Sequence, residues 1–172
     1  MDMNQARFNM IEQQIRPWEV LDPQVLALLS TVRREDFVPL AHKALAFVDM
    51  EIPLGAAPNQ VMLAPRVQAR LLQDLAVQKT DKVLDIGTGS GFMAAMLAHQ
   101  AASVLSLEID PALAAQAQAN LQKAGVSNAT VRCADGSAGA AADGPFDAIA
   151  LSGSVAEVPA ALLQQLTVGG RL

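Results

Sequence analysis

The chain has 172 residues, a hydrophobic fraction of 52% and a formal net charge of −5, which fits a single domain whose core needs no disulfide or metal. An acidic chain without a cluster of Lys and Arg is not expected to bind nucleic acid, and no apolar stretch reaches the roughly 20 residues of a membrane span. The single cysteine excludes a disulfide within the chain and, with an N-terminus that lacks the pattern of a signal peptide, predicts a cytoplasmic protein.

Residues 1–78 are expected to form a helical and irregular region within the same domain. Apolar residues at helical spacing predict helices over residues 6–15, from Pro23 and from Pro65. Asp22 favours a helix start, because an aspartate can accept hydrogen bonds from the first N–H groups and proline suits the first turn. The segment 49–65 is rich in proline and glycine and is predicted to be an ordered loop.

Residues 79–172 alternate between short apolar strands and helices. The predicted strands are Lys82–Ile86, Ser103–Leu107, Ala129–Cys133 and Phe146–Leu151, and the predicted helices are Phe92–His99, Pro111–Ala124 and Pro159–Leu166. This order predicts an α/β fold: a Rossmann-like, doubly wound, mainly parallel sheet with helices on both faces, preceded by the N-terminal helical extension. Gly169–Leu172 is expected to be a turn that enters a fifth strand, so we expect the domain, 1–172, to be truncated at its C-terminus.

A glycine-rich turn follows the first of these strands and is the strongest functional signal. The turn has the pattern G-x-G-x-G and consists of Gly87, Thr88, Gly89, Ser90 and Gly91. Phe92 breaks the dinucleotide pattern G-x-G-x-x-G, and the phosphate-binding pattern G-x-x-x-x-G-K-[ST] is absent. Asp85 before the turn would repel a phosphate but attract an ammonium or sulfonium group, and S-adenosylmethionine carries both of these groups and no phosphate.

Two further acids follow neighbouring strands, where ligands of open α/β sheets bind. Glu108 could accept hydrogen bonds from two ribose hydroxyls, and Asp135 with Gly136 could meet an adenine amino group. Taken singly, Glu108 could be a solvated acid at a strand end, and Asp135-Gly136 an ordinary turn. Together with Asp85 and the glycine turn, they predict a binding site for one extended nucleoside.

The other candidate residues are interpreted as structural. His42 and His99 lack a partner at a suggestive spacing, so we expect them to be structural or solvated. Cys133 is expected in the core, and Met93 and Met96 are expected to pack rather than to contact a cofactor. The sequence identifies no catalytic side chain and no cluster of metal ligands.

The sequence resembles the protein-L-isoaspartate O-methyltransferases, a branch of the Rossmann-like methyltransferases, over most of its length. The segments that carry the resemblance are Met10–Ile15, Val32–Pro39, Ala46–Asp49, Ile52–Gly55, Asp85–Phe92, Ser106–Glu108, Asp135–Gly136, Pro145–Ile149 and Gly169–Leu172. The resemblance implies S-adenosyl-L-methionine as cofactor and, as substrate, a damaged protein or peptide with an isoaspartyl carboxylate.

Two departures from the family pattern concern the acceptor. The family has Gln-Thr-Ile-Ser-x-Pro where this chain has Gln60–Pro65, so that Leu63 replaces a serine associated with activity. The segment 56–59 is also about two residues longer than usual. Two other functions therefore remain open: a methyltransferase for another acceptor, and a non-catalytic module that binds the cofactor or a partner. The sequence does not indicate an oligomeric state.

Overall fold

The computed structural model describes residues 2–55 and 57–172, and the chain divides into two compact units, residues 1–76 and 77–172. Met1 and Ala56 lie outside the described residues, so that part of the predicted insertion at 56–59 is not described. Within the described residues, no helix combines the length and the apolar character that a membrane crossing would require.

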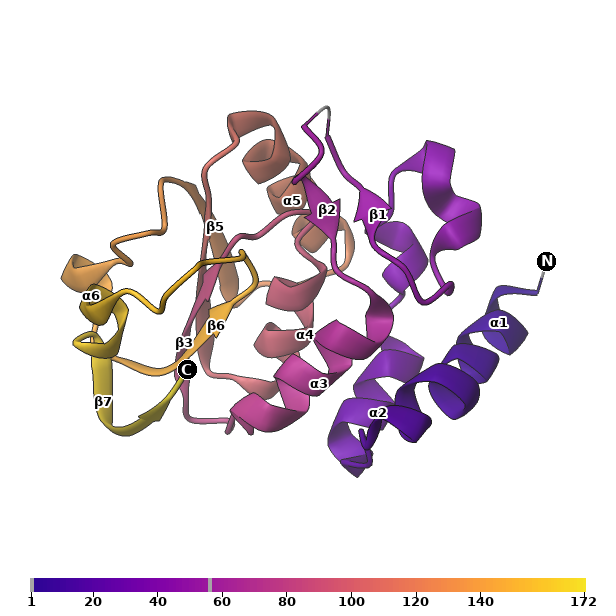
Figure 1. Cartoon of the computed structure of the whole chain (residues 1–172), viewed down its shortest axis with the longest axis horizontal. Helices are drawn as coiled ribbons and strands as arrows, with labels where there is room; N and C mark the ends of the chain where they lie inside the picture. The colour runs from indigo at the N-terminus through magenta and orange to yellow at the C-terminus, as the bar shows by residue number, and fades with distance from the viewer. Residues whose placement is uncertain (1, 56) are drawn as a thin grey trace. The chain divides into compact units, whose positions relative to one another are not determined.

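Most of the first unit is short helical segments (Figure 1). Its buried apolar side chains form a core. Its helices are α1 (Met3–Met10), the π-helical η1 (Ile11–Ile15), the 3-10 segments η2 (Arg16–Trp18), η3 (Arg34–Asp36) and η4 (Leu40–Leu45), α2 (Pro23–Thr31) and α3 (Pro65–Leu75). The helix expected at 6–15 begins earlier, because the Asp2 carboxylate accepts hydrogen bonds from the N–H groups of Asn4 and Gln5. The helical path also continues past Pro17 to Trp18.

The segment expected to be a loop, 49–65, contains a small antiparallel ladder. Strand β1 (Ile52–Pro53) pairs with β2 (Val61–Met62). The segment predicted to be an ordered loop thus includes two strands that the sequence did not predict, because two-residue strands are too short to show an alternating pattern.

A buried arginine holds the end of this segment. The Arg34 guanidinium is 1% exposed and donates to the carbonyl oxygens of Ala46, at 2.9 Å, and Leu63, at 2.8 Å, and to the Gln68 side chain. Burial lowers the pKa of Arg34 to about 9, and the negative charge of Asp49 partly opposes this shift. The backbone at Leu63 is thereby fixed to the core of the first unit.

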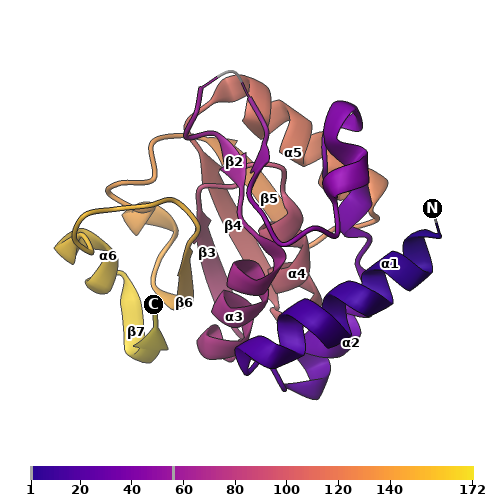
Figure 2. The same ribbon diagram turned by 45° about the vertical axis from the view of Figure 1, so that its right-hand side comes forward.

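The second unit is a five-stranded parallel sheet with helices, as the sequence predicted (Figures 1 and 2). Its strands are β3 (Lys82–Ile86), β4 (Ser103–Glu108), β5 (Ala129–Cys133), β6 (Phe146–Leu151) and β7 (Leu166–Arg171), in the order β5-β4-β3-β6-β7. Its helices are α4 (Phe92–Gln100), α5 (Pro111–Lys123), the 3-10 turn η5 (Ala141–Asp143) and α6 (Ala160–Leu163).

The two faces of the sheet carry different side chains. Leu84 and Ile86 pack in one apolar cluster with Leu162 of α6. Because side chains alternate along a strand, Val83 and Asp85 point to the opposite face, and α4 packs against β3 and β4. The burial of Met93 and Met96 in α4 confirms that they pack in the core.

Two expectations at the edges of the sheet were wrong. Cys133 is exposed, because the outer end of the edge strand β5 is only partly covered. The last helix is shorter than expected, and β7 already begins at Leu166. Gly169, with φ of +81°, lies inside β7, where the register shifts between the pairs Phe146–Leu166 and Ala148–Arg171.

The Asp22 cap gives a stability test of the first unit. Its carboxylate accepts hydrogen bonds from the N–H groups of Gln24, at 2.7 Å, and Val25, at 3.2 Å. We expect Asp22→Ala to lower the free energy of unfolding by about 1 kcal/mol, because these N–H groups lose their acceptor. Urea denaturation followed by circular dichroism measures the loss. Asp22→Asn keeps an acceptor oxygen and should unfold close to the wild type; an equal loss in both variants would contradict the assignment.

Candidate functional site

A pocket of about 250 Å³ lies at the carboxyl ends of the parallel strands in the second unit. Parallel pairing aligns these ends, so that residues distant in the sequence meet there. Four of the residues predicted from the sequence line the pocket: Gly87, Glu108, Asp135 and Gly136. The other five, which the structure also describes, do not line it: Asp85, Thr88, Gly89, Ser90 and Gly91. Contact of any of the nine with a cofactor stays a prediction.

The apolar part of the lining was not recognised in the sequence. Ile86 and Leu107 come from strand ends, and Ile109, which is 68% exposed, follows Glu108 directly. The loop after β6 adds Gly153 and Val155. An isoleucine directly after a strand-end acid was a usable signal, whereas nothing in the sequence distinguishes the loop after β6.

Two backbone hydrogen bonds hold the Glu108 carboxylate. Its side chain is nearly buried, and one carboxylate oxygen accepts a hydrogen bond of 2.8 Å from the Gly89 N–H. The other oxygen accepts from the Asp110 N–H at 3.0 Å. These bonds attach the glycine turn to the end of β4, and each carboxylate oxygen retains lone pairs for further donors.

Asp135 and Gly136 form the wall that follows β5. Asp135 is exposed, and hydrogen bonds from Ser137 lower the pKa of its carboxyl group, which therefore stays ionised at neutral pH. A Cβ atom on Gly136 would lie 2.5 Å from Cγ2 of Ile86. Only glycine allows the backbone at position 136 to pass so close to Ile86 of β3. This close approach brings the neighbouring Asp135 to the pocket.

The first glycine of the turn lies against the loop after β6. Gly87 has φ of +89°, and a Cβ atom there would lie 2.9 Å from the Gly153 nitrogen. A side chain at this position would be strained and would force the two segments apart. The glycine turn and the loop after β6 therefore form adjacent walls of the pocket.

Asp85 is fully buried on the other face of the sheet. Its two oxygens accept hydrogen bonds from the hydroxyls of Ser106, at 2.6 Å, and Ser152, at 3.0 Å. Burial raises the pKa of Asp85 to about 6, which the two serine hydrogen bonds oppose and the charge of Glu108 reinforces.

The lining chemistry fits a nucleoside. Glu108 and Asp135 can accept hydrogen bonds from hydroxyl and amino groups, and the apolar side chains between them can pack against a planar base. None of the described residues that line the pocket is basic, so the lining offers no cationic side chain to a phosphate. These residues fit the nucleoside part of S-adenosylmethionine.

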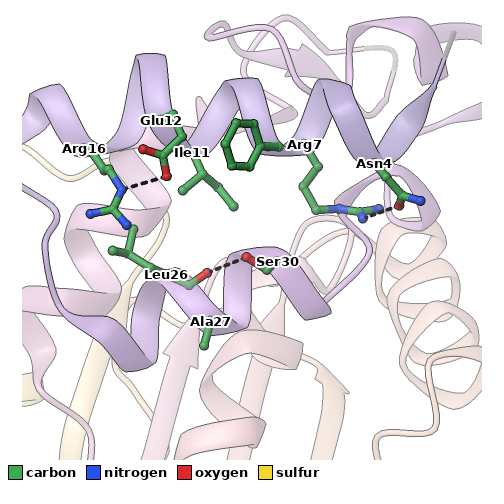
Figure 3. Close-up of a pocket in the computed structure, with 9 residues that line it drawn as sticks. Asn4, Arg7, Ile11, Glu12, Arg16, Leu26, Ala27 and Ser30 are labelled. Carbon is green, nitrogen blue, oxygen red and sulfur yellow. Dashed lines mark hydrogen bonds and ion pairs between the residues drawn. The ribbon is translucent and has the colours of Figure 1, made fainter.

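A second and larger hollow, of about 420 Å³, lies in the first unit between α1, η1 and α2 (Figure 3). Glu12 and Arg16 lie at one end and Arg7 at the other (Figure 3). Both arginines already form ion pairs, Arg16 with Glu12 at 2.8 Å and Arg7 with Glu35 at 2.6 Å. This hollow contains no residue that the sequence predicted for the site.

Both histidines lie outside the pocket at the carboxyl ends of the strands. His99 is exposed at the end of α4, and its carbonyl oxygen accepts a hydrogen bond from Lys79. His42 is partly buried in η4. Within residues 2–55 and 57–172, no group of three or more His, Cys, Asp or Glu side chains could hold a metal ion.

Comparison with known proteins decides the family. A family model described as protein-L-isoaspartate(D-aspartate) O-methyltransferase matches residues 5–172. The chain belongs to this family. It is 42% identical over 171 residues to protein-L-isoaspartate O-methyltransferase 2 of Marinobacter nauticus, with 99% of this chain and 77% of that protein covered. A relative from Syntrophobacter fumaroxidans, protein-L-isoaspartate O-methyltransferase 1, is 40% identical, with coverages of 99% and 79%.

Solved structures agree on the fold. One solved structure, of a protein-L-isoaspartate O-methyltransferase, superposes with a TM-score of 0.76 at 22% identity. The match covers 98% of this chain and about half (53%) of the chain in the solved structure. The second, from Plasmodium falciparum and described as putative, was solved with S-adenosyl-L-homocysteine; its TM-score is 0.75 at 18% identity, with coverages of 97% and 80%. As a member of this family, the protein is an S-adenosylmethionine-dependent methyltransferase.

The buried Asp85 gives this family member a measurable pH dependence of stability. Its pKa rises from 3.8 to about 6 on folding, so the folded state binds the proton more tightly than the unfolded state. Protonation of Asp85 contributes about 3 kcal/mol to the free energy of unfolding. This stabilisation is fully present below pH 3.8 and is lost as the pH rises through about 6. We expect Asp85→Asn, which carries no charge, to escape this loss.

Urea denaturation between pH 4 and pH 8 tests this expectation. The free energy of unfolding of Asp85→Asn should increase relative to the wild type as the pH rises, mostly between pH 4 and pH 6.5. The control is Asp74→Asn, which removes an exposed carboxylate in the first unit. Parallel pH profiles for the wild type and Asp85→Asn would contradict the assigned shift.

Proposed function

We propose that this protein transfers the methyl group of S-adenosylmethionine to the carboxylate of isoaspartyl residues in damaged proteins or peptides. The observation that carries the proposal is a pocket with two carboxylates, an apolar floor and no basic lining residue among those described. It lies at the carboxyl ends of the parallel strands in a member of the isoaspartyl methyltransferase family. We also propose a cytoplasmic location, on the basis of the single cysteine.

The reaction requires little from the side chains. S-adenosylmethionine supplies an electrophilic methyl group on a positively charged sulfur. An isoaspartyl carboxylate is ionised at neutral pH, so no general base is needed to make it a nucleophile. Glu108 and Asp135 are proposed to bind the nucleoside, and the apolar lining keeps water from part of the pocket. The protein then acts mainly through orientation and proximity.

One observation favours a different acceptor as the second candidate. Leu63 replaces the serine of the family pattern, and an aliphatic side chain cannot donate a hydrogen bond to a carboxylate. The Arg34 guanidinium holds the Leu63 carbonyl, so the backbone is fixed although the hydroxyl is missing. A third candidate, a module that binds the cofactor without transferring its methyl group, remains an outcome of the same experiment.

Methyl transfer from labelled S-adenosylmethionine separates the three candidates. The acceptors are an isoaspartyl peptide and the matching aspartyl peptide of the same sequence. Label in the isoaspartyl peptide alone supports the proposal. Cofactor binding without label in either peptide excludes an isoaspartyl acceptor, and a screen of small-molecule and protein acceptors then distinguishes the second candidate from the third.

Glu108 gives the test of the cofactor site. We expect Glu108→Gln to bind S-adenosylhomocysteine about fivefold more weakly, because hydrogen bonds to a charged acceptor are about 1 kcal/mol stronger than neutral ones. Isothermal titration calorimetry measures the dissociation constant. Glu51→Gln removes an exposed carboxylate in the first unit and is the matched control. Unchanged affinity in Glu108→Gln would remove this residue from the proposed site.

Leu63 gives the test of the acceptor. We expect Leu63→Ser to raise kcat/KM for the isoaspartyl peptide about tenfold, because a hydroxyl that bonds a charged group contributes about 1–3 kcal/mol. The dissociation constant of S-adenosylhomocysteine should not change. Leu63→Ala, which shortens the side chain without adding a hydroxyl, controls for space. Equal kcat/KM values for Leu63→Ser and Leu63→Ala would favour the second candidate acceptor.

A further inference from the structure

A chain of hydroxyl groups, buried at Ser106 and Thr88 and partly buried at Ser152, connects Asp85 to two walls of the pocket. Ser106 of β4 lies in register with Asp85 of β3, so their side chains share one face of the sheet. Ser152 follows β6 and reaches the other oxygen of the same carboxylate. Thr88 in the glycine turn lies with its hydroxyl 2.6 Å from the Ser106 hydroxyl.

The directions of these hydrogen bonds follow from the number of protons. A serine hydroxyl has one proton, and Ser106 uses it to donate to the Asp85 carboxylate. The Ser106 oxygen must then accept the proton of Thr88. Ser152 donates its own proton to Asp85. The ionised carboxylate therefore orients three hydroxyls, which come from β4, from the glycine turn and from the loop after β6.

The segments held in this way are the same segments that form the pocket. The N–H groups of Gly87 and Thr88 both donate to the Leu107 carbonyl, at 2.9 and 3.2 Å. The N–H groups of Ser152 and Gly153 both donate to the Ile86 carbonyl, at 2.9 and 3.1 Å.

Gly87 and Gly153 line the pocket and nearly touch each other. A displacement of the hydroxyl network would therefore move both walls.

Asp85, which the sequence predicted to attract a cationic group of the cofactor, is 0% exposed and does not line this pocket. Its contact with the cofactor stays a prediction. We propose that Asp85, Ser106, Ser152 and Thr88 form a positioning unit that holds the glycine turn and the loop after β6 at the spacing that the cofactor needs. Asp85 thus acts on cofactor binding through the three hydroxyls. The inference rests on the cofactor site of the proposed function but not on the identity of the methyl acceptor.

Affinity for S-adenosylhomocysteine is the first measurement. We expect Ser106→Ala and Ser152→Ala each to raise its dissociation constant about tenfold, since each removes a hydrogen bond to a charged group from a pocket wall. Ser152→Thr keeps the hydroxyl and should restore most of the affinity. Ser103→Ala is the matched control, because it makes the same change on the same strand at an exposed position.

Amide hydrogen exchange in the cofactor-free protein is the second measurement. In Ser106→Ala and Ser152→Ala we expect about tenfold faster exchange at Gly87, Thr88, Ser152 and Gly153. The amides of the β3–β4 ladder should exchange as in the wild type. A purely structural role would lower the melting temperature without this local pattern and without a change in affinity.

The outcomes separate this inference from the proposed function. Wild-type affinity and wild-type exchange in both alanine variants would overturn the positioning unit. Binding of S-adenosylhomocysteine without methylation of the isoaspartyl peptide would overturn the proposed acceptor alone. Failure of the wild type to bind S-adenosylhomocysteine would overturn both, since the cofactor site itself would then be wrong.

Discussion

The parallel pairing of β3 with β4 and with β6 is the constraint on which the site depends. This register places Asp85 beside Ser106 and brings the ends of three strands to one edge. Alternation along β3 sends Ile86 and Asp85 to opposite faces, so that one forms the floor of the pocket and the other anchors its walls. A slip of one residue would exchange these roles and bury the carboxylate among leucines.

Much of the second unit was predictable because local signals and fold agree there. The strands at 82–86, 129–133 and 146–151 occur where the apolar runs predicted them, between clear turn residues. Gly125 ends α5 with φ of +73°, as a glycine after a helix should. The acids Glu108 and Asp135 could be placed at one edge because parallel strands leave their carboxyl ends together.

The features that the sequence did not reveal depend on tertiary contacts. Phe8 has helical spacing with Ile11 but is 58% exposed, since the spacing alone does not specify which side is covered. Cys133 is exposed because β5 is an edge strand, and strand order is not visible in a single strand. The partners of Asp85 come from residues 21 and 67 positions away, and only the register identifies them.

The distance along the chain between the parts of the pocket has a consequence for biosynthesis. The lining extends from Ile86 to Leu162, and each of β3, β4, β5 and β6 contributes a strand end or the segment that follows it. A nascent chain that has emerged only as far as β5 lacks the loop after β6 and one wall of the pocket. A pocket with all of these walls therefore forms only after the ribosome has synthesised the chain through Leu162.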